Sequence, residues 1–243
     1  MVSFIVPAHN EEAWIGRSLS AIAEVMKSFA LAHEVIVVDD ASTDATATIG
    51  KNAGARIIRV SHRQIAAARN AGARNARGDI LFFVDADTLV NAGIIQSALQ
   101  VLSEGAVAGG CVPKFEGELP LWFRAIYPLM IFAMRSILHQ TGGACLFCTR
   151  AAFMASGGFS EEHYAAEEDV WVKAVKKHGR FIVLAEPVIT SGRSLRTQSV
   201  WTIGLLFLRL ALQGSDAFRD RRGSVLWYRP TQGDFPKDVR QKK

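Results

Sequence analysis

The chain has 243 residues, of which 49% are hydrophobic and 21% are charged, and its formal net charge is +5. This balance excludes an intrinsically disordered chain, and the length suits one large domain with its own hydrophobic core. Three cysteines are too few for a disulfide framework, and the first residues lack the pattern of a signal peptide, so we expect a cytoplasmic protein.

Apolar runs alternate with helical periodicity over the first 90 residues. Continuous β-branched and aromatic runs predict four buried strands, over 2–7, 33–40, 55–60 and 79–87. Apolar residues at helical spacing predict three helices between them, over 11–29, 44–53 and 63–77. Buried strands that alternate with helices indicate an α/β fold with a mostly parallel sheet covered on both faces.

The pattern loosens after residue 90. We expect helices over 92–103, from 150 onward and over 167–179, and strands over 105–112, 142–149 and 180–185. Residues 119–138 are very apolar and predict a helical insertion, and residues 199–213 predict a second apolar helix. The tail over 215–243 holds eight Lys or Arg and four Asp, so it carries most of the excess positive charge.

Acidic and polar residues gather where the predicted strands end. In a parallel α/β sheet, ligands bind at the carboxyl ends of the strands. Asp85 and Asp87 end the fourth strand, and in extended chain both side chains would point to the same face. Hard oxygen ligands without Cys or His suit Mg²⁺ or Mn²⁺ shared with phosphates, although an isolated Asp-x-Asp also ends many strands as a turn.

Two further acidic pairs allow both a functional and a structural interpretation. Asp39 and Asp40 end the second strand, where carboxylates can accept the ring N–H of a nucleobase or ribose hydroxyls, or cap the next helix. Ser42 could supply that cap instead. Glu168 and Asp169 open a predicted helix, where the helix dipole stabilises them and where a carboxylate could also serve as a general base.

Several other classes of site are disfavoured. Cys145 and Cys148 form a single Cys-x-x-Cys within a strand-like apolar run, so we expect buried core thiols. No pair of histidines has metal-ligand spacing. Neither a Gly-x-Gly-x-x-Gly after the first strand nor a Walker-type phosphate loop occurs, so the sequence does not predict a typical dinucleotide or triphosphate site.

Six short motifs occur in a specific order: VPAHNEE (6–12), VVDDASTD (37–44), AAARNAG (66–72), FVDADT (83–88), GGF (157–159) and EED (167–169). Each is weak alone, but the ordered set resembles the family-2 inverting glycosyltransferases with the GT-A fold, over roughly residues 1–190. The resemblance implies a GT-A catalytic domain over 1–198, with a nucleotide half over about 1–90 and an acceptor half over about 91–198. An apolar helix and basic tail would follow over 199–243.

The resemblance also implies roles for individual residues on the donor side. It implies that the base and ribose of a nucleotide are lined by Pro7, Ala8, His9 and Glu11. Asp40, and less directly Asp39, would accept the ring N–H of the base. Arg69 would lie near the base or its acidic partner.

For the metal ion and the catalytic base, the resemblance implies four acidic residues. Asp85 and Asp87 match the family's Asp-x-Asp. They would hold a divalent cation, Mn²⁺ or Mg²⁺, with Asp87 as the more direct ligand and Asp85 also on the nucleotide. Asp169 matches the family's catalytic base, with Glu168 beside it.

Two pairs of residues are implied at the acceptor and the diphosphate. Gly142 and Gly143 would border the acceptor site. Arg193 and Arg196 could clamp the diphosphate, or they could be surface charge. The chain lacks the Gln-x-x-Arg-Trp motif of the family's processive enzymes, which argues against a polymer-forming enzyme, and no clear downstream histidine offers a third metal ligand.

Neither apolar segment predicts a transmembrane helix. Residues 119–138 include Arg124 and Arg135, and residues 199–213 are too short to span a bilayer. Interleaved aromatic and basic side chains in the first segment suit an interfacial helix that lies flat on a bilayer, or a core or dimer helix. With the basic tail, they predict peripheral contact with the anionic inner face of the cytoplasmic membrane.

The sequence therefore predicts an inverting, metal-dependent transferase that moves a sugar from a nucleotide-diphosphate sugar, with a UDP-sugar favoured, to a glycan or lipid-linked acceptor of cell-envelope synthesis. A catalytically silent nucleotide-sugar-binding protein is the alternative. A nucleotidyltransferase would need a basic, Gly-rich triphosphate loop, which residues 8–10 do not form. The basic tail also suits nucleic acid, but no groove-reading motif is present, so we expect no nucleic-acid partner.

Overall fold

A seven-stranded sheet forms the centre of the computed structural model, which describes residues 1–117, 119–132, 135, 141, 143–164 and 166–193. The strand order is β3-β2-β1-β4-β8-β6-β9. In chain order, the strands are β1 (Val2–Ala8), β2 (His33–Asp40), β3 (Arg56–Val60), β4 (Ile80–Val84), β6 (Ala106–Gly110), β8 (Cys145–Thr149) and β9 (Arg180–Val183). Every pair of neighbours is parallel except those that involve β8, which is antiparallel to both β4 and β6. The predicted mostly parallel α/β sheet is confirmed.

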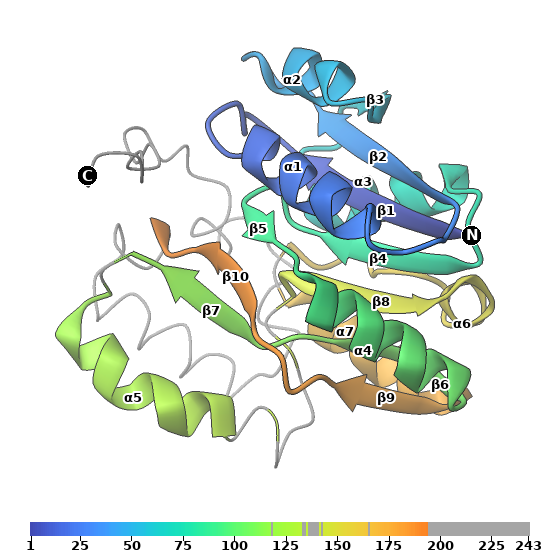
Figure 1. Cartoon of the computed structure of the whole chain (residues 1–243), viewed down its shortest axis with the longest axis vertical. Helices are drawn as coiled ribbons and strands as arrows, with labels where there is room; N and C mark the ends of the chain where they lie inside the picture. Colours follow the sequence, from blue (N-terminus) through green and yellow to red (C-terminus); the bar gives the residue numbers. More distant parts are fainter. Residues whose placement is uncertain (118, 133–134, 136–140, 142, 165, 194–243) are drawn as a thin grey trace.

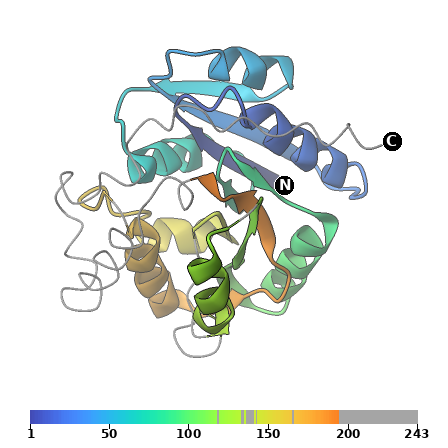
Figure 2. The same ribbon diagram turned by 90° about the vertical axis from the view of Figure 1, so that its left-hand side faces the viewer.

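Helices cover both faces of this sheet (Figures 1 and 2). They are α1 (Ile15–Met26), α2 (Thr46–Asn52), α3 (Ile65–Asn75), α4 (Ala92–Ser103), α6 (Arg150–Ala155) and α7 (Glu167–Val175), with a short 3₁₀ turn, Lys176–His178, after α7. Successive strand residues point to opposite faces, so Phe4 and Val6 pack with α1 and α4, whereas Ile5 packs with α3. Burial on both faces explains why these strands are continuously apolar.

A second, three-stranded sheet lies beside the first one and was not predicted. Its order is β5 (Thr88–Leu89), β10 (Val188–Ser191) and β7 (Pro113–Glu116). Strands of two to four residues are too short to show an alternating pattern, which is why the sequence did not reveal them. Because β5 directly follows Asp87, its pairing with β10 brings the end of β10 to the carboxyl edge of the central sheet.

The first helix begins four residues later than its periodicity predicts, at Ile15 rather than at residue 11. The intervening loop is held by hydrogen bonds to the segment after β2. The backbone N–H of Glu11 donates to Thr46 Oγ1 over 2.7 Å, and that of Glu12 donates to Asp44 Oδ2 over 3.1 Å. These contacts keep residues 11–14 out of the helix and fix the loop that follows β1.

The predicted cap of the next helix is wrong. Helix α2 begins at Thr46 after Ala45, so Ser42 is too far upstream to cap it. Asp44 Oδ1 accepts the backbone N–H of Thr46 over 2.9 Å, while Ser42 Oγ accepts that of Asn10 over 3.0 Å. Ser42 therefore ties two loops together instead of capping a helix.

Helix α5 (Leu121–Phe132) lies at the periphery, beside the small sheet (Figure 1). It packs through a cluster of rings in which Phe115 of β7 contacts Phe123 and Tyr127, with centroids 5.7 and 5.8 Å apart. Among the described residues, no helix combines the length and apolar character needed to cross a membrane. The predicted helix over 199–213, the basic tail and most of 133–140 lie outside the described residues.

The three cysteines are buried and free, as predicted for core thiols. Cys145 and Cys148 lie on opposite faces of β8, because an odd separation along a strand reverses the side-chain direction. The Cys-x-x-Cys pair therefore cannot direct both sulfur atoms at one metal ion.

Candidate active site

The buried guanidinium of Arg69, on α3, joins two segments that lie far apart in the sequence. Its Nη2 donates to Asp85 Oδ1 over 2.8 Å, and its Nη1 donates to Glu167 Oε1, 98 residues away, also over 2.8 Å. Nη2 also donates to the carbonyl oxygen of Gly143 over 3.1 Å. The carboxyl end of β4, the start of α7 and the turn before β8 therefore meet at one side chain.

Arg69 and Glu167 are buried in this ion-pair cluster while the Asp85 side chain is 28% exposed, and burial shifts the pKa values of both carboxyl groups. Arg69 is 2% exposed and Glu167 is 4% exposed. Burial raises the pKa of Glu167 to about 8, with a further upward contribution from neighbouring Glu168, while Arg69 opposes the shift. Burial likewise raises the pKa of Asp85 against the attraction of Arg69. The charge of Arg69 thus favours the ionised form of both carboxyl groups, while burial favours the protonated form.

Helix α3 also holds the Gly-Gly-Phe segment that lies between α6 and α7. Asn70 Nδ2 donates to the carbonyl oxygen of Phe159 over 2.8 Å, and Asn70 Oδ1 accepts the backbone N–H of the same residue over 2.9 Å. A Cβ atom on Gly158, whose φ is +76°, would lie 2.8 Å from Asn70 Oδ1. Glycine is therefore required at this position, both for its φ angle and for the close approach to α3.

Asp85 and Asp87 do not point to one face, as an extended chain would require. Strand β4 ends at Val84, and the carbonyl oxygen of Asp85 accepts the N–H of Thr88 over 3.0 Å, which closes a turn. Asp85 consequently faces Arg69, whereas Asp87 Oδ1 accepts a hydrogen bond from Thr190 Oγ1 over 3.3 Å. The two carboxylates still influence each other electrostatically, because Asp85 contributes to the raised pKa of Asp87.

Arg193 forms the second ion-pair cluster of the site, just beyond β10. Its Nη1 donates to Glu11 Oε2 over 2.8 Å, and its Nη2 donates to the other carboxylate oxygen, Oε1. Its Nε lies 3.5 Å from Asp87 Oδ2. Burial raises the pKa of Asp87 to about 7, which Arg193 counteracts. Arg193 therefore lies beside Asp87, and its predicted role as a clamp of the diphosphate stays a prediction.

The residues predicted to line a nucleotide lie together at the ends of β1 and β2. Pro7 and Ala8 are buried and pair in register with Val38 and Asp39. The ring Nδ1–H of His9 donates to the carbonyl oxygen of Asp40 over 2.7 Å, which joins the two strand ends. The backbone therefore brings these residues to the same edge as Glu11.

Asp40 organises the loop before α3. Its carboxylate accepts three backbone N–H groups, from His62, Arg63 and Gln64, over 2.7, 2.8 and 2.9 Å. A carboxylate offers about four acceptor positions, so one remains for a ligand. Asp39 Oδ1 accepts the N–H of Ser42 over 3.2 Å, and its role with a nucleotide stays a prediction.

The first turn of α7 carries three consecutive acids that face different neighbours. A Cβ atom on Gly143 would lie 3.1 Å from Glu168 Oε1, so Glu168 lies against the Gly143 backbone. Burial raises the pKa of Asp169 to about 7, and Glu168 adds to the shift, while Lys173 and Lys176 oppose it. The carboxyl group of Asp169 is therefore poised to change protonation near neutral pH.

Sequence reasoning identified Arg69 and the acids at 168 and 169 but missed Glu167 and Asn70. A signal for Glu167 was present, because Glu167, Trp171 and Val175 recur at every fourth position on the buried side of α7. Nothing local distinguishes Asn70 from any other helical asparagine. Gly142 and Arg196 lie outside the described residues.

The oxygen atoms at Asp85 and Asp87 fit a hard divalent cation. Asp85 uses Oδ1 for Arg69, while its Oδ2 has no hydrogen bond or ion pair within the described residues. No group of three His, Cys, Asp or Glu side chains in the described part of the chain converges as a ready metal cage. A cation here would take its other ligands from phosphate and water, as Mg²⁺ commonly does.

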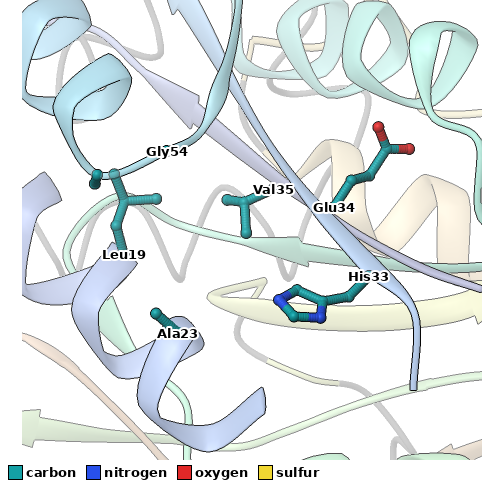
Figure 3. A pocket seen from close by; sticks show the side chains of 7 residues that line it. Leu19, Ala23, His33, Glu34, Val35 and Gly54 are labelled. Carbon is teal, nitrogen blue, oxygen red and sulfur yellow. The ribbon is translucent and has the colours of Figure 1, made fainter. Parts of the chain in front are cut away.

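A cavity of about 170 Å³ lies at the opposite edge of the sheet, between α1, β2 and the end of α2 (Figure 3). Leu19, His33 and Val35 contribute to its lining. His33 and Val35 belong to the amino end of β2, whereas the acidic side chains follow the carboxyl ends of the strands. This cavity is therefore separate from the candidate active site.

The sequence profile of glycosyl transferase family 2 matches residues 3–158, well over half of the chain. The chain belongs to glycosyl transferase family 2. The match includes the ends of β1, β2 and β4 with Arg69, but ends before α7. Contacts with Arg69 and Gly143 bring Glu167 and Glu168 to the site, whereas the role of Asp169 stays a prediction.

Two curated relatives show how similar this chain is to known proteins. Validoxylamine A glucosyltransferase of Streptomyces hygroscopicus subsp. limoneus is 31% identical over 130 residues, which are 49% of this chain and 28% of that protein. The chain therefore spans less than a third of the length of that relative. The GalNAc(5)-diNAcBac-PP-undecaprenol beta-1,3-glucosyltransferase of Campylobacter jejuni is 23% identical over 231 residues, covering 86% of this chain and 72% of that enzyme.

Solved structures of glycosyltransferases share the architecture of this family 2 chain. TarS of S. aureus in complex with UDP superposes with a TM-score of 0.61 at 19% identity, covering 89% of this chain and 73% of that one. The mannosyltransferase PcManGT of Pyrobaculum calidifontis, in complex with GDP-Man and Mn²⁺, gives 0.63 at 23% identity, covering 80% and 60%. These likenesses confirm the predicted GT-A fold.

Replacing Arg69 tests whether this family 2 site depends on the buried cluster. We expect Arg69→Gln to lower the free energy of unfolding by about 3–5 kcal/mol, because Glu167 would remain buried, and Asp85 partly buried, without their partner. Arg17→Gln is the matched control, since Arg17 donates to both oxygens of Glu116 at a partly exposed position and should cost less than about 1 kcal/mol. Urea unfolding at pH 7 measures both values, and equal losses would contradict the assignment.

Proposed function

We propose that this chain is an inverting glycosyltransferase that uses a nucleotide-diphosphate sugar, with a UDP-sugar favoured, and an acceptor hydroxyl or phosphate. The observation that carries this proposal is the joining of Asp85 and the start of α7 by Arg69. This contact supports a site in which Asp85 lies near the helix start that carries Glu168 and Asp169, the acids predicted for the base. Membership in family 2 supports the same reaction class.

The donor would lie along the ends of β1, β2 and β4. The Asp40 carboxylate accepts three backbone N–H groups and would accept a ring N–H of the base as a fourth donor. Pro7 and Ala8, at the end of the neighbouring strand, would contact the base with apolar surface. Asp85 Oδ2 and Asp87 would hold Mn²⁺ or Mg²⁺ with the diphosphate. When bound, the cation would act as a Lewis acid that neutralises the leaving nucleotide diphosphate.

Asp169 would accept the proton of the acceptor hydroxyl while the acceptor oxygen attacks the anomeric carbon. The bond from that carbon to the diphosphate oxygen breaks on the opposite face, which inverts the configuration. A pKa of about 7 suits a general base at neutral pH, where it is ionised yet still basic. Glu168, against Gly143, would border the acceptor.

Calorimetric titration with UDP and GDP, each with and without Mn²⁺, tests the donor site. We expect one nucleotide, UDP in our proposal, to bind tightly only with Mn²⁺, because the diphosphate needs the cation between it and the two aspartates. Asp87→Asn should abolish the metal dependence. Asp79→Asn should not, because the side chain of Asp79 is 86% exposed and, within the described part of the chain, pairs only with the N-terminus.

Each result of this titration has a definite meaning. Absence of binding by both nucleotides would contradict the proposal. Binding without any transfer that depends on Asp169 would instead support a catalytically silent nucleotide-sugar-binding protein.

The pH dependence of transfer tests the base. We expect kcat/KM to rise with pH through about 7, because the protonated form of Asp169, which dominates below that pH, cannot accept a proton. Asp169→Asn should lower the rate by about 10²–10⁴-fold, with Asp79→Asn unchanged. A flat profile between pH 6 and 8 would contradict this role, and loss of the profile in Glu168→Gln alone would transfer it to Glu168.

The acceptor is proposed to be lipid-linked, at the inner face of the cytoplasmic membrane. One family relative from Campylobacter jejuni has an undecaprenol-linked substrate in its name. In this chain, α5 exposes large apolar side chains away from its ring cluster, with Leu121, Leu129 and Phe132 exposed by 79, 69 and 59%. Arg124 is exposed on the same helix, which suits an anionic bilayer surface.

Binding to vesicles tests this surface. We expect the protein to sediment with phosphatidylglycerol vesicles at low salt and not with phosphatidylcholine vesicles. Leu129→Asp should weaken binding about tenfold or more, because it removes an inserted apolar side chain. Met154→Asp is the matched control, since Met154 is also exposed on a helix, α6, outside this surface. Equal binding by both variants would argue against docking through α5.

A further inference from the structure

Arg193 lies beside the carboxylate of Asp87, which a metal ion would need as a ligand. It forms a two-pronged pair with Glu11, 182 residues away in the sequence, and its Nε is 3.5 Å from Asp87 Oδ2. The side chains of Glu11, Asp87 and Arg193 are 14, 15 and 21% exposed, so water screens these charges little. The guanidinium thus already supplies positive charge at the Asp-x-Asp turn.

Thr190 of the small sheet holds one carboxylate oxygen of Asp87, Oδ1. Thr190 Oγ1 donates to Oδ1, and Thr190 itself accepts a hydrogen bond from Thr88 Oγ1 over 2.9 Å. The hydroxyl of Ser191 accepts the backbone N–H of Arg193 over 3.2 Å, which sets the turn that directs Arg193 toward the site. The pairing of β10 with β5 therefore positions Arg193 through several independent contacts.

The Arg193 guanidinium and a divalent cation at Asp87 would repel each other, because both carry positive charge and both would lie beside the same carboxylate. A metal ion that binds Asp87 alone would therefore have to displace Arg193, and the loss of the Arg193 contacts lowers the affinity of the site for that ion. A diphosphate can offset this cost, because the released guanidinium has a planar fork that fits phosphate oxygens.

We propose that Arg193 is a built-in counter-cation of the Asp-x-Asp turn, which a divalent metal displaces only together with a diphosphate. Metal binding is thereby made dependent on the donor, and free Mn²⁺ binds weakly. The inference rests on the proposed donor site, but it concerns the affinity for the metal alone and can fail independently.

Titration of the full chain with Mn²⁺ alone, followed by the electron paramagnetic resonance signal of the free ion, tests the proposal. We expect Arg193→Gln to bind Mn²⁺ at least tenfold more tightly than the unsubstituted chain, because Glu11, Asp85 and Asp87 lose their competing cation. Arg193→Lys should give a smaller increase in Mn²⁺ affinity, since lysine keeps the positive charge but lacks the planar pair of donors that bonds both oxygens of Glu11. Arg56→Gln, which removes an arginine paired with Glu34 at the amino ends of β3 and β2, should leave Mn²⁺ affinity unchanged.

A second arm uses UDP together with Mn²⁺. We expect Arg193→Gln to lower the affinity for this pair while it raises that for Mn²⁺ alone, an opposition that a merely structural arginine would not produce. An unchanged or weaker Mn²⁺ affinity in a variant that retains its cooperative thermal transition would overturn the proposal. If Arg193→Gln does not fold, Arg193→Lys decides the question by the same criterion. Failure of UDP and GDP to bind the unsubstituted chain would instead overturn the proposed function, and the Mn²⁺ arm would still report on Arg193.

Discussion

The burial of Arg69 is the constraint on which the rest of the site depends. A guanidinium that is 2% exposed is stable only where its charge is compensated, and Asp85, Glu167 and the Gly143 carbonyl provide this compensation. Since these partners come from β4, α7 and the turn before β8, the chain cannot satisfy Arg69 without assembling both halves of the candidate active site. Folding and preorganisation of the site are thus the same event.

The site remains rich in negative charge even with both of its arginines in place. Among the described residues, Arg69 and Arg193 face a larger set of acids: Glu11, Asp85, Asp87, Glu167 and Glu168. Burial and neighbouring acids together raise the pKa of Asp87 to about 7, and burial together with Glu168 raises that of Asp169 to about 7. The same imbalance favours a cation on the donor side and a proton acceptor on the acceptor side, so one electrostatic feature serves both halves of the proposed reaction.

Much of the fold could be predicted from the sequence because the central strands are buried on both faces. Continuous apolar runs located β1, β2, β3 and β4 to within a few residues, and helical spacing placed α4 at its observed bounds. The errors fell where tertiary contacts override local preference: the loop before α1 is held by Asp44 and Thr46, and β7 and β10 are too short to carry a pattern.

The sequence by itself determined which chemical groups stand at the strand ends, since those follow directly from runs of acids after apolar strands. Tertiary structure alone decided the partner of each group. The turn closed between Asp85 and Thr88 sends Asp85 to Arg69 and leaves Asp87 to the small sheet, and Arg193 reaches Glu11 across 182 residues. Local periodicity reports which side of an element is buried, but it holds no information about which distant side chain will lie opposite, because that depends on how the sheets and helices pack.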